Sequence, residues 1–137
     1  MRTFFDSSAF AKRFLEEPGS GRVEEICART EELGISVLCL PEVVSALNRR
    51  RRERVLTAAQ YEQAKRRLIE DVRDADVVQL TPGVVASAVA ILEAGAVRTM
   101  DALQVACAGE WGSEMFVSGD RAQLAAARRA GLIVRAV

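Results

Sequence analysis

At 137 residues the chain has the length of about one globular domain, and half of its residues are hydrophobic, so its stability needs neither a disulfide framework nor a structural metal. The formal net charge is zero, which argues against a uniformly basic coat for nucleic acid. The chain contains no histidine, which excludes serine- and cysteine-histidine nucleophiles, histidine-ligated metals and the two-histidine chemistry of metal-free ribonucleases.

Short apolar runs bounded by Gly, Pro, Asp or Ser alternate along the chain with longer segments of helical period, as expected for buried strands and amphipathic helices. In chain order, strands are expected at Arg2–Phe5, Ile35–Leu38, Val77–Leu80, Met115–Ser118 and Leu132–Arg135. Between them, helices are expected at about 20–29, 42–54, 58–72, 82–94, 99–106 and 121–130. The alternation predicts an α/β fold in which a parallel sheet is covered by helices on both faces.

Several residues mark where these helices should begin. Pro41 and Pro82 suit the first helical position, and Thr57 and Thr99 can cap the helices that follow them. Asp120, followed three residues later by a glutamine, resembles a capping box before the last helix.

Four acids fall where the chain should pass the carboxyl edge of the sheet or begin a helix. Asp6 directly follows the first strand, Glu42 and Asp101 lie in first helical turns, and Asp120 follows the fourth strand across one glycine. Ligands of open α/β sheets bind at this edge. Taken singly, each acid is better explained as a helix cap than as a catalytic group, because carboxylates accept backbone N–H bonds and complement the helix dipole.

If the four acids converge, their charges need compensation. Two carboxylates about 4 Å apart repel each other by roughly 4 kcal/mol at an effective dielectric constant near 20. Raised pKa values, helix N-termini or a bound cation can offset this repulsion. With carboxylate oxygens as the only ligands, the cation is expected to be Mg²⁺, with Mn²⁺ as a possible substitute.

The three cysteines are far apart and form no CxxC pair, so we expect free thiols that behave as small buried hydrophobes. Reduced thiols, an amino terminus without a signal peptide and the lack of a run of about 20 apolar residues predict a soluble cytoplasmic protein with no membrane segment.

The order and spacing of four short motifs resemble the PIN-domain nucleases, and most closely the VapC-type toxins of bacterial toxin–antitoxin pairs. These motifs are Asp6-Ser7-Ser8-Ala9 with Lys12 beyond it, Pro41-Glu42-Val43, Asp101-Ala102-Leu103-Gln104 and Val117-Ser118-Gly119-Asp120. The resemblance covers nearly the whole chain. It implies a single PIN-like nuclease domain over residues 1–137, with a three-layer α/β/α fold and a five-stranded parallel sheet. It also implies an Mg²⁺-dependent endoribonuclease, a small cognate antitoxin as partner, and a homodimer.

Carried over position by position, the family's acidic quartet falls on Asp6, Glu42, Asp101 and Asp120. Its supporting hydroxyls fall on Ser8 and Ser118, whereas Gln104 stands where many relatives have histidine. The working hypothesis is hydrolysis of RNA by a metal-activated water. Asp6 and Asp101 are then the principal metal ligands, Asp120 completes the metal site, and Glu42 orients or deprotonates the water. Attack by water predicts 5′-phosphate and 3′-hydroxyl ends.

A block of arginines, Arg49, Arg50, Arg51 and Arg52, ends the helix that carries Glu42. The block is explained equally by a solvated helix end, by phosphate contacts with RNA, or by contact with an acidic stretch of the antitoxin.

Other functions for an acidic cleft in an α/β protein fit less well. A phosphoacceptor receiver domain needs a late lysine, but the only lysines are Lys12 and Lys65. A dehalogenase-type phosphatase needs a second aspartate two residues after the first, where this chain has Ser8. The non-enzymatic alternative is a dimeric binding protein whose acids merely cap helices.

Overall fold

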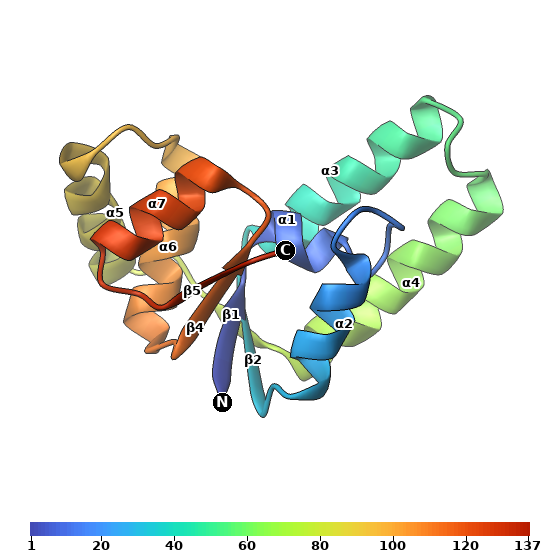
Figure 1. Cartoon of the computed structure of the whole chain (residues 1–137). Coiled ribbons are helices and arrows are strands. Elements are labelled where there is room, and N and C mark those ends of the chain that lie inside the picture. The colour runs from blue at the N-terminus through green and yellow to red at the C-terminus, as the bar shows by residue number, and fades with distance from the viewer.

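A computed structural model describes all residues, 1–137, and contains one five-stranded parallel sheet (Figure 1). The strands are β1 (Arg2–Phe5), β2 (Glu32–Ser36), β3 (Asp76–Val78), β4 (Met115–Ser118) and β5 (Val134–Ala136), in the spatial order β3-β2-β1-β4-β5. The helices are α1 (Ser7–Ala11), α2 (Ser20–Ala28), α3 (Cys39–Arg52), α4 (Ala58–Asp74), α5 (Pro82–Ala94), α6 (Thr99–Trp111) and α7 (Arg121–Arg129). The predicted α/β fold with a parallel sheet is confirmed.

Helices cover both faces of the sheet, and each face has its own apolar core. Side chains alternate along a strand, so Phe4 and Phe5, both fully buried, belong to different cores. Phe5 packs in the core built with helices α1 to α4, and Phe4 packs in the core built with α5, α6 and α7. Figure 1 shows these two groups of helices on opposite sides of the strands, with the α3–α4 hairpin reaching away from the body. No helix is long and apolar enough to cross a membrane.

Strands β1 and β4 have the predicted bounds, but three strands are shifted relative to the prediction. Strand β2 begins at Glu32, three residues before the predicted start, and the others lie at Asp76–Val78 and Val134–Ala136. The amino end of β2 carries Glu32 and Gly34, which do not have the apolar character of a buried strand. Partners on neighbouring elements explain their presence: Glu32 pairs with the guanidinium of Arg2.

Trp111 packs against the same end of the sheet. Its indole lies against Gly34, where an added Cβ would come within 2.8 Å of the ring. The Arg2 guanidinium lies over the Trp111 ring, 4.2 Å from the ring centroid. The indole N–H donates a hydrogen bond to Asp76 Oδ2 at 3.2 Å. Glycine in β2 is therefore required by the close approach of an aromatic ring.

Helix starts agree with the prediction in part. Thr57 caps α4 in a full capping box, and Pro82 opens α5. Helix α3 begins at Cys39, so Pro41 is its third residue rather than its first. Proline is tolerated there because the backbone N–H groups of a first helical turn have no acceptor within the helix. The cap of α6 is Arg98, not Thr99, and it makes no side-chain capping bond. The short helix α1 was not predicted, because five residues are too few for a periodic pattern.

Candidate active site

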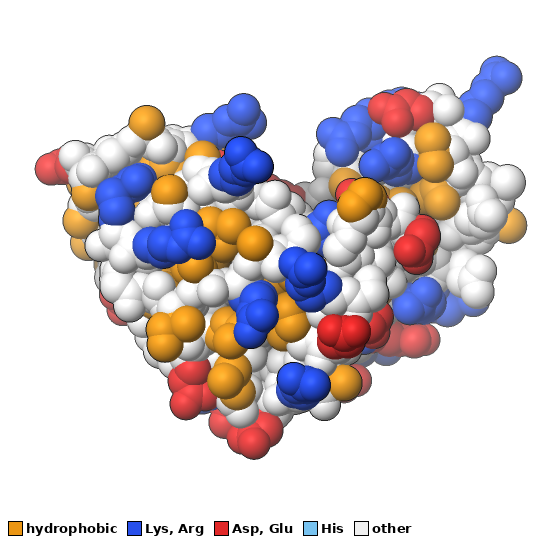
Figure 2. All heavy atoms as spheres, in the orientation of Figure 1, with side chains coloured by type: hydrophobic (Ala, Val, Ile, Leu, Met, Phe, Trp, Pro, Cys, Tyr) orange, Lys and Arg blue, Asp and Glu red, His pale blue; other side chains and the backbone are white.

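The four acids predicted from the sequence lie around the carboxyl edge of the sheet, at its topological switch point. The chain moves outward from β1 through β2 to β3, and then returns to place β4 on the other side of β1. Asp6 follows β1 and donates its backbone N–H to Val117 of β4 at 3.0 Å. Crevices of this kind are where doubly wound sheets bind ligands. Figure 2 shows the surface hollowed between two lobes, with Lys and Arg side chains on both rims.

Asp6 is the most buried of the four acids, with only 1% of its surface exposed. Its Oδ1 accepts hydrogen bonds from Ala9 N at 2.8 Å and from Ser8 Oγ at 2.7 Å, and its Oδ2 accepts one from Ser118 Oγ. Ser8 also accepts from Gly119 N at 3.1 Å, and Ser118 accepts from Asp120 N at 3.0 Å. The two hydroxyls predicted to support the site therefore both hold Asp6 and connect it to the loop after β4.

The pKa of Asp6 is raised from 3.8 to about 6, and burial is the main cause. The hydrogen bonds from Ser118, Ala9 and Ser8 favour the carboxylate and offset part of this effect, whereas the charge of Asp101 raises the pKa further. A buried carboxyl with a perturbed pKa at a switch point is a frequent property of functional sites.

Asp101 lies in the first turn of α6, and its pKa is raised by partial burial and then by the charges of Asp120 and Glu42. Arg98 offsets part of this increase. No protein group donates a hydrogen bond to the Asp101 carboxylate, so its oxygens are free for a ligand. Asp120 caps α7, with its Oδ1 accepting from Ala122 N at 2.8 Å and Gln123 N at 3.3 Å.

The predicted capping box at Asp120 is only half formed. The Gln123 amide does not return to the backbone N–H of Asp120 and instead donates to the main-chain oxygen of Asp101 at 3.4 Å. This bond ties the start of α7 to the start of α6.

Glu42 lies in the first turn of α3 and belongs to a hydrogen-bonded group that the sequence did not reveal. Its Oε1 accepts from Ser7 Oγ at 2.7 Å and from Gln104 Nε2 at 2.7 Å. The only sequence signal for this group is that Gln104 is three residues after Asp101, on the same face of α6. Ser7 offered no signal beyond its position next to Asp6.

The donor chemistry of the site fits a hard divalent cation. Every acid offers carboxylate oxygens, and the charges of Asp120 and Glu42 raise the pKa of Asp101, so a bound cation would offset this repulsion. No three acid or thiol side chains lie close enough together to form a metal site by themselves. Mg²⁺ is compatible with such an open set, because it keeps several waters and binds through one or two carboxylates.

A groove of about 400 Å³ adjoins the acids. It is lined by Ser7, Ser8, Ala11, Lys12, Glu17, Glu42, Ser45, Ala46, Arg49 and Gly119. Arg49 is the member of the arginine block that reaches this groove, and Arg49 to Arg52 form the last turn of α3 without any ion pair to an acid. Positive charge and the acid Glu42 therefore line one surface.

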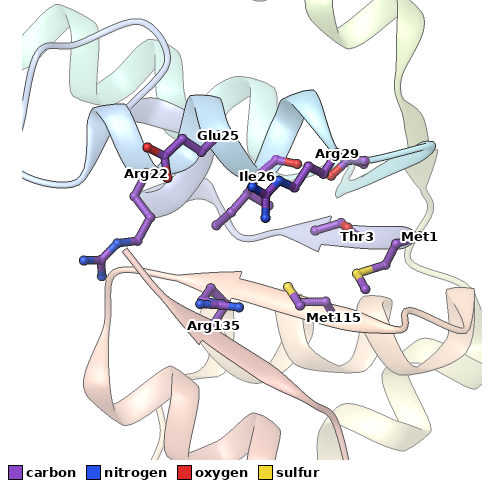
Figure 3. A pocket seen from close by; sticks show the side chains of 9 residues that line it. Met1, Thr3, Arg22, Glu25, Ile26, Arg29, Met115 and Arg135 are labelled. Carbon is purple, nitrogen blue, oxygen red and sulfur yellow. The ribbon is translucent and has the colours of Figure 1, made fainter.

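A second hollow lies away from the acids, between α2 and strands β1, β4 and β5 (Figure 3). Three arginines, Arg22, Arg29 and Arg135, surround its apolar floor, and its only acid is Glu25. It lacks the group of carboxylates that marks the carboxyl edge.

The three cysteines form no disulfide bond. All three are free, Cys39 and Cys107 are buried, and Cys27 is half-buried, as predicted. Burial raises the pKa of Cys27 to about 11 and that of Cys39 to about 12, so neither thiol is poised to ionise as a nucleophile near neutral pH.

A sequence model of the PIN domain matches residues 3–129. No curated protein is similar in sequence. Solved structures are similar in fold at low identity. The VapC20 toxin of Mycobacterium tuberculosis, described as cleaving the sarcin–ricin loop, matches with a TM-score of 0.71 at 19% identity, over 96% of each chain.

Two further structures show the same fold. VapBC2 of Rickettsia felis, bound to a DNA fragment from its promoter, has a TM-score of 0.71 at 13% identity, over 100% of this chain and 99% of the other. The protein PAE2754 of Pyrobaculum aerophilum has a TM-score of 0.67 at 23% identity, over 98% of this chain and 89% of the other. Each of the three matches extends over at least 96% of this chain.

Proposed function

Because the chain belongs to the PIN-domain family, we propose that it is a divalent-cation-dependent endoribonuclease and the toxin of a toxin–antitoxin pair. The observation that carries the proposal is the convergence of Asp6, Glu42, Asp101 and Asp120 on one edge of the sheet, where Asp6 and Asp101 have raised pKa values. Helix capping alone accounts for Asp120, which caps α7. It does not account for Asp101, whose carboxylate caps no helix.

Asp6 and Asp101 would be the principal ligands of the cation, Mg²⁺ or Mn²⁺, and Asp120 would complete the site directly or through a metal-bound water. When bound, the cation would lower the pKa of a water and stabilise charge on the phosphate and on the leaving oxygen. Ser8 and Ser118 fix the orientation of the Asp6 carboxylate and favour its ionised form. Asp6 must lose its proton before it can act as a ligand, and its pKa of about 6 allows this near neutral pH.

Glu42 orients the attacking water or accepts its proton. This carboxylate lines the groove beside the other acids, and its Oε2 receives no hydrogen bond from the protein. Attack by water on the phosphodiester leaves a 5′-phosphate and a 3′-hydroxyl.

The groove is proposed to bind the RNA backbone. Arg49 lines it, and the adjacent Arg50, Arg51 and Arg52 extend the positive charge along the last turn of α3. Guanidinium groups bind phosphate oxygens in bidentate geometry, whereas a net charge of zero gives the chain as a whole no general attraction for RNA.

The partner is proposed to be a cognate antitoxin. VapBC structures from other organisms, similar to this chain in fold, contain a toxin with its antitoxin, and the resemblance to VapC toxins is the support for this part of the proposal. We extend it to a homodimer in the cytoplasm, with residues 1–137 acting as one nuclease domain.

The first test is cleavage of a labelled RNA with Mg²⁺ by the wild-type chain, Asp6→Asn and Asp101→Asn. We expect cleavage by the wild type only, with both variants remaining folded. A folded wild type that binds RNA but leaves it uncut with Mg²⁺ or Mn²⁺ would favour a non-catalytic binding protein. Unfolding of both variants would favour helix capping as the role of these acids.

A further inference from the structure

Three side chains from elements far apart in the sequence form one hydrogen-bonded group beside the acids. Gln104 Nε2 donates to Glu42 Oε1 at 2.7 Å and to Ser7 Oγ at 2.8 Å. The Ser7 hydroxyl in turn donates to the same Glu42 Oε1 at 2.7 Å. One carboxylate oxygen of Glu42 is thus held by two donors, one from α1 and one from α6.

Gln104 is an unusual residue for its place in the fold. It is only 2% exposed and is followed on α6 by four buried apolar residues, Val105, Ala106, Cys107 and Ala108. Its own oxygen, Oε1, is buried and has no hydrogen-bond partner. Buried polar atoms are nearly always paired, so an unpaired one calls for an explanation.

The orientation of the amide supplies that explanation. If the amide were reversed, its oxygen would face a carboxylate oxygen, and two acceptors would be in contact. The observed orientation gives both N–H contacts to Glu42 and Ser7 and leaves Oε1 buried without a partner. The Gln104 amide therefore donates a hydrogen bond to Glu42, and its own oxygen is left without a partner.

We propose that Gln104 is a positioning residue, which fixes the Glu42 carboxyl group through Oε1 and leaves Oε2 as the oxygen available to the groove. The inference rests on the proposed function, in which Glu42 orients or deprotonates the attacking water. Gln104 does not itself line the groove and makes no hydrogen bond to Asp6, so it acts through Glu42 and Ser7, which do line it.

Gln104→Met removes the donor, keeps the length of the side chain and removes the unpaired oxygen. We expect kcat for RNA cleavage to fall by roughly 10- to 100-fold, as is typical when a supporting hydrogen bond to a site ligand is lost, with KM changed less than about twofold because no phosphate contact is removed. The thermal midpoint should stay the same or rise. Ser113→Ala is the control, since Ser113 Oγ is likewise buried without a hydrogen-bond partner but follows the carboxyl end of α6, away from the acids.

Two further variants separate a donor role from a packing role. In Gln104→Glu, the new carboxyl can donate to Glu42 only while the pair shares a proton. Its cleavage rate should therefore fall as pH rises, while the wild-type rate rises as Asp6 ionises. Gln104→His supplies a neutral ring N–H and should restore most of the rate. A wild-type kcat in Gln104→Met, or a wild-type pH profile in Gln104→Glu, would overturn the proposal.

A double-mutant cycle provides a measurement that does not depend on nuclease activity. Unfolding by urea of the metal-free wild type, Gln104→Met, Glu42→Met and the double variant gives the coupling between the two side chains, because each methionine removes one partner of the hydrogen bond. We expect a favourable coupling, and additive effects would overturn the inference. Coupling in a wild-type chain that cleaves no RNA would instead refute the proposed function while leaving the hydrogen bond intact.

Discussion

Ser118 donates its hydroxyl hydrogen to Oδ2 of Asp6 across the junction between β1 and β4. Among the hydrogen bonds of Asp6, this bond lowers its pKa most and partly offsets the effect of burial. The same oxygen of Ser118 accepts from Asp120 N at 3.0 Å. One hydroxyl therefore adjusts the charge of the most buried acid and connects it to the start of α7.

Ser118→Ala should raise the pKa of Asp6 above its value of about 6. The acid limb of the pH–rate profile should then move upward, lowering the rate at pH 6 by roughly three- to tenfold, as expected for loss of about 1 kcal/mol of carboxylate stabilisation. The rate should recover by about pH 8. Ser8→Ala is the comparison and should have a smaller effect, because Ser8 lowers the pKa less than Ser118 does. A larger shift in Ser8→Ala would contradict this ranking.

Asp6→Asn should stabilise the metal-free protein at neutral pH. The folded state binds the Asp6 proton more tightly than the unfolded state, so the wild type loses up to about 3 kcal/mol of stability as pH rises from 3.8 to about 6. Asparagine can still cap α1, so we expect a net gain of about 1–3 kcal/mol at pH 7.5 that vanishes below pH 4.

Urea unfolding in EDTA at pH 7.5, 5.5 and 4 measures this difference. The control is Glu70→Gln, which neutralises an exposed carboxylate of α4 that makes no ion pair. If the gain in the free energy of unfolding of Asp6→Asn did not change with pH, the charge of Asp6 would not be its cause.

Replacing Arg49, Arg50, Arg51 and Arg52 together by Gln should weaken RNA binding at low salt. Each lost phosphate contact reduces the slope of log affinity against log salt concentration by about 0.7 for a single strand. Fluorescence anisotropy between 50 and 300 mM salt, with Asp6→Asn used to prevent cleavage, gives both quantities. Arg73→Gln, at the far end of α4, is the control. Equal salt slopes in the wild-type and fourfold-substituted backgrounds would assign the block to a solvated helix end.

Gly34→Ala should destabilise the fold by about 1–3 kcal/mol, because its Cβ would lie 2.8 Å from the Trp111 ring. The cost should be smaller in a Trp111→Leu background, where the ring is absent. Chemical denaturation of the four proteins measures the difference. An equal cost in both backgrounds would mean that Trp111 is not the source of the strain.

The sequence was informative wherever local signals agreed with the tertiary environment. Strands β1 and β4, both buried and apolar, and helix α5, which opens at Pro82, have the predicted bounds. Strand β2 was displaced because its amino end depends on Arg2 and Trp111, which pair with Glu32 and stack on Gly34. Neither partner is near β2 in the sequence.

The position of the four acids at the sheet edge could be predicted from the sequence, but the side chains that hydrogen-bond to them could be predicted only in part. Asp6, Glu42, Asp101 and Asp120 are each adjacent to a predicted strand end or helix start, which places them at one edge. The bond between Gln104 and Ser7 joins residues 97 positions apart, and nothing local in either segment indicates it. Residues that position other residues are recognised by distance and burial, which only the folded chain provides.

The most direct test of the account is the chemistry of the RNA ends. A defined RNA is incubated with wild-type protein and Mg²⁺, and with Asp101→Asn as the control, and the products are mapped with and without excess EDTA. Water-mediated hydrolysis at the acidic site predicts 5′-phosphate and 3′-hydroxyl ends, no products in EDTA, and no products from the variant. Ends bearing 2′,3′-cyclic phosphate, or undiminished cleavage in EDTA, would contradict it.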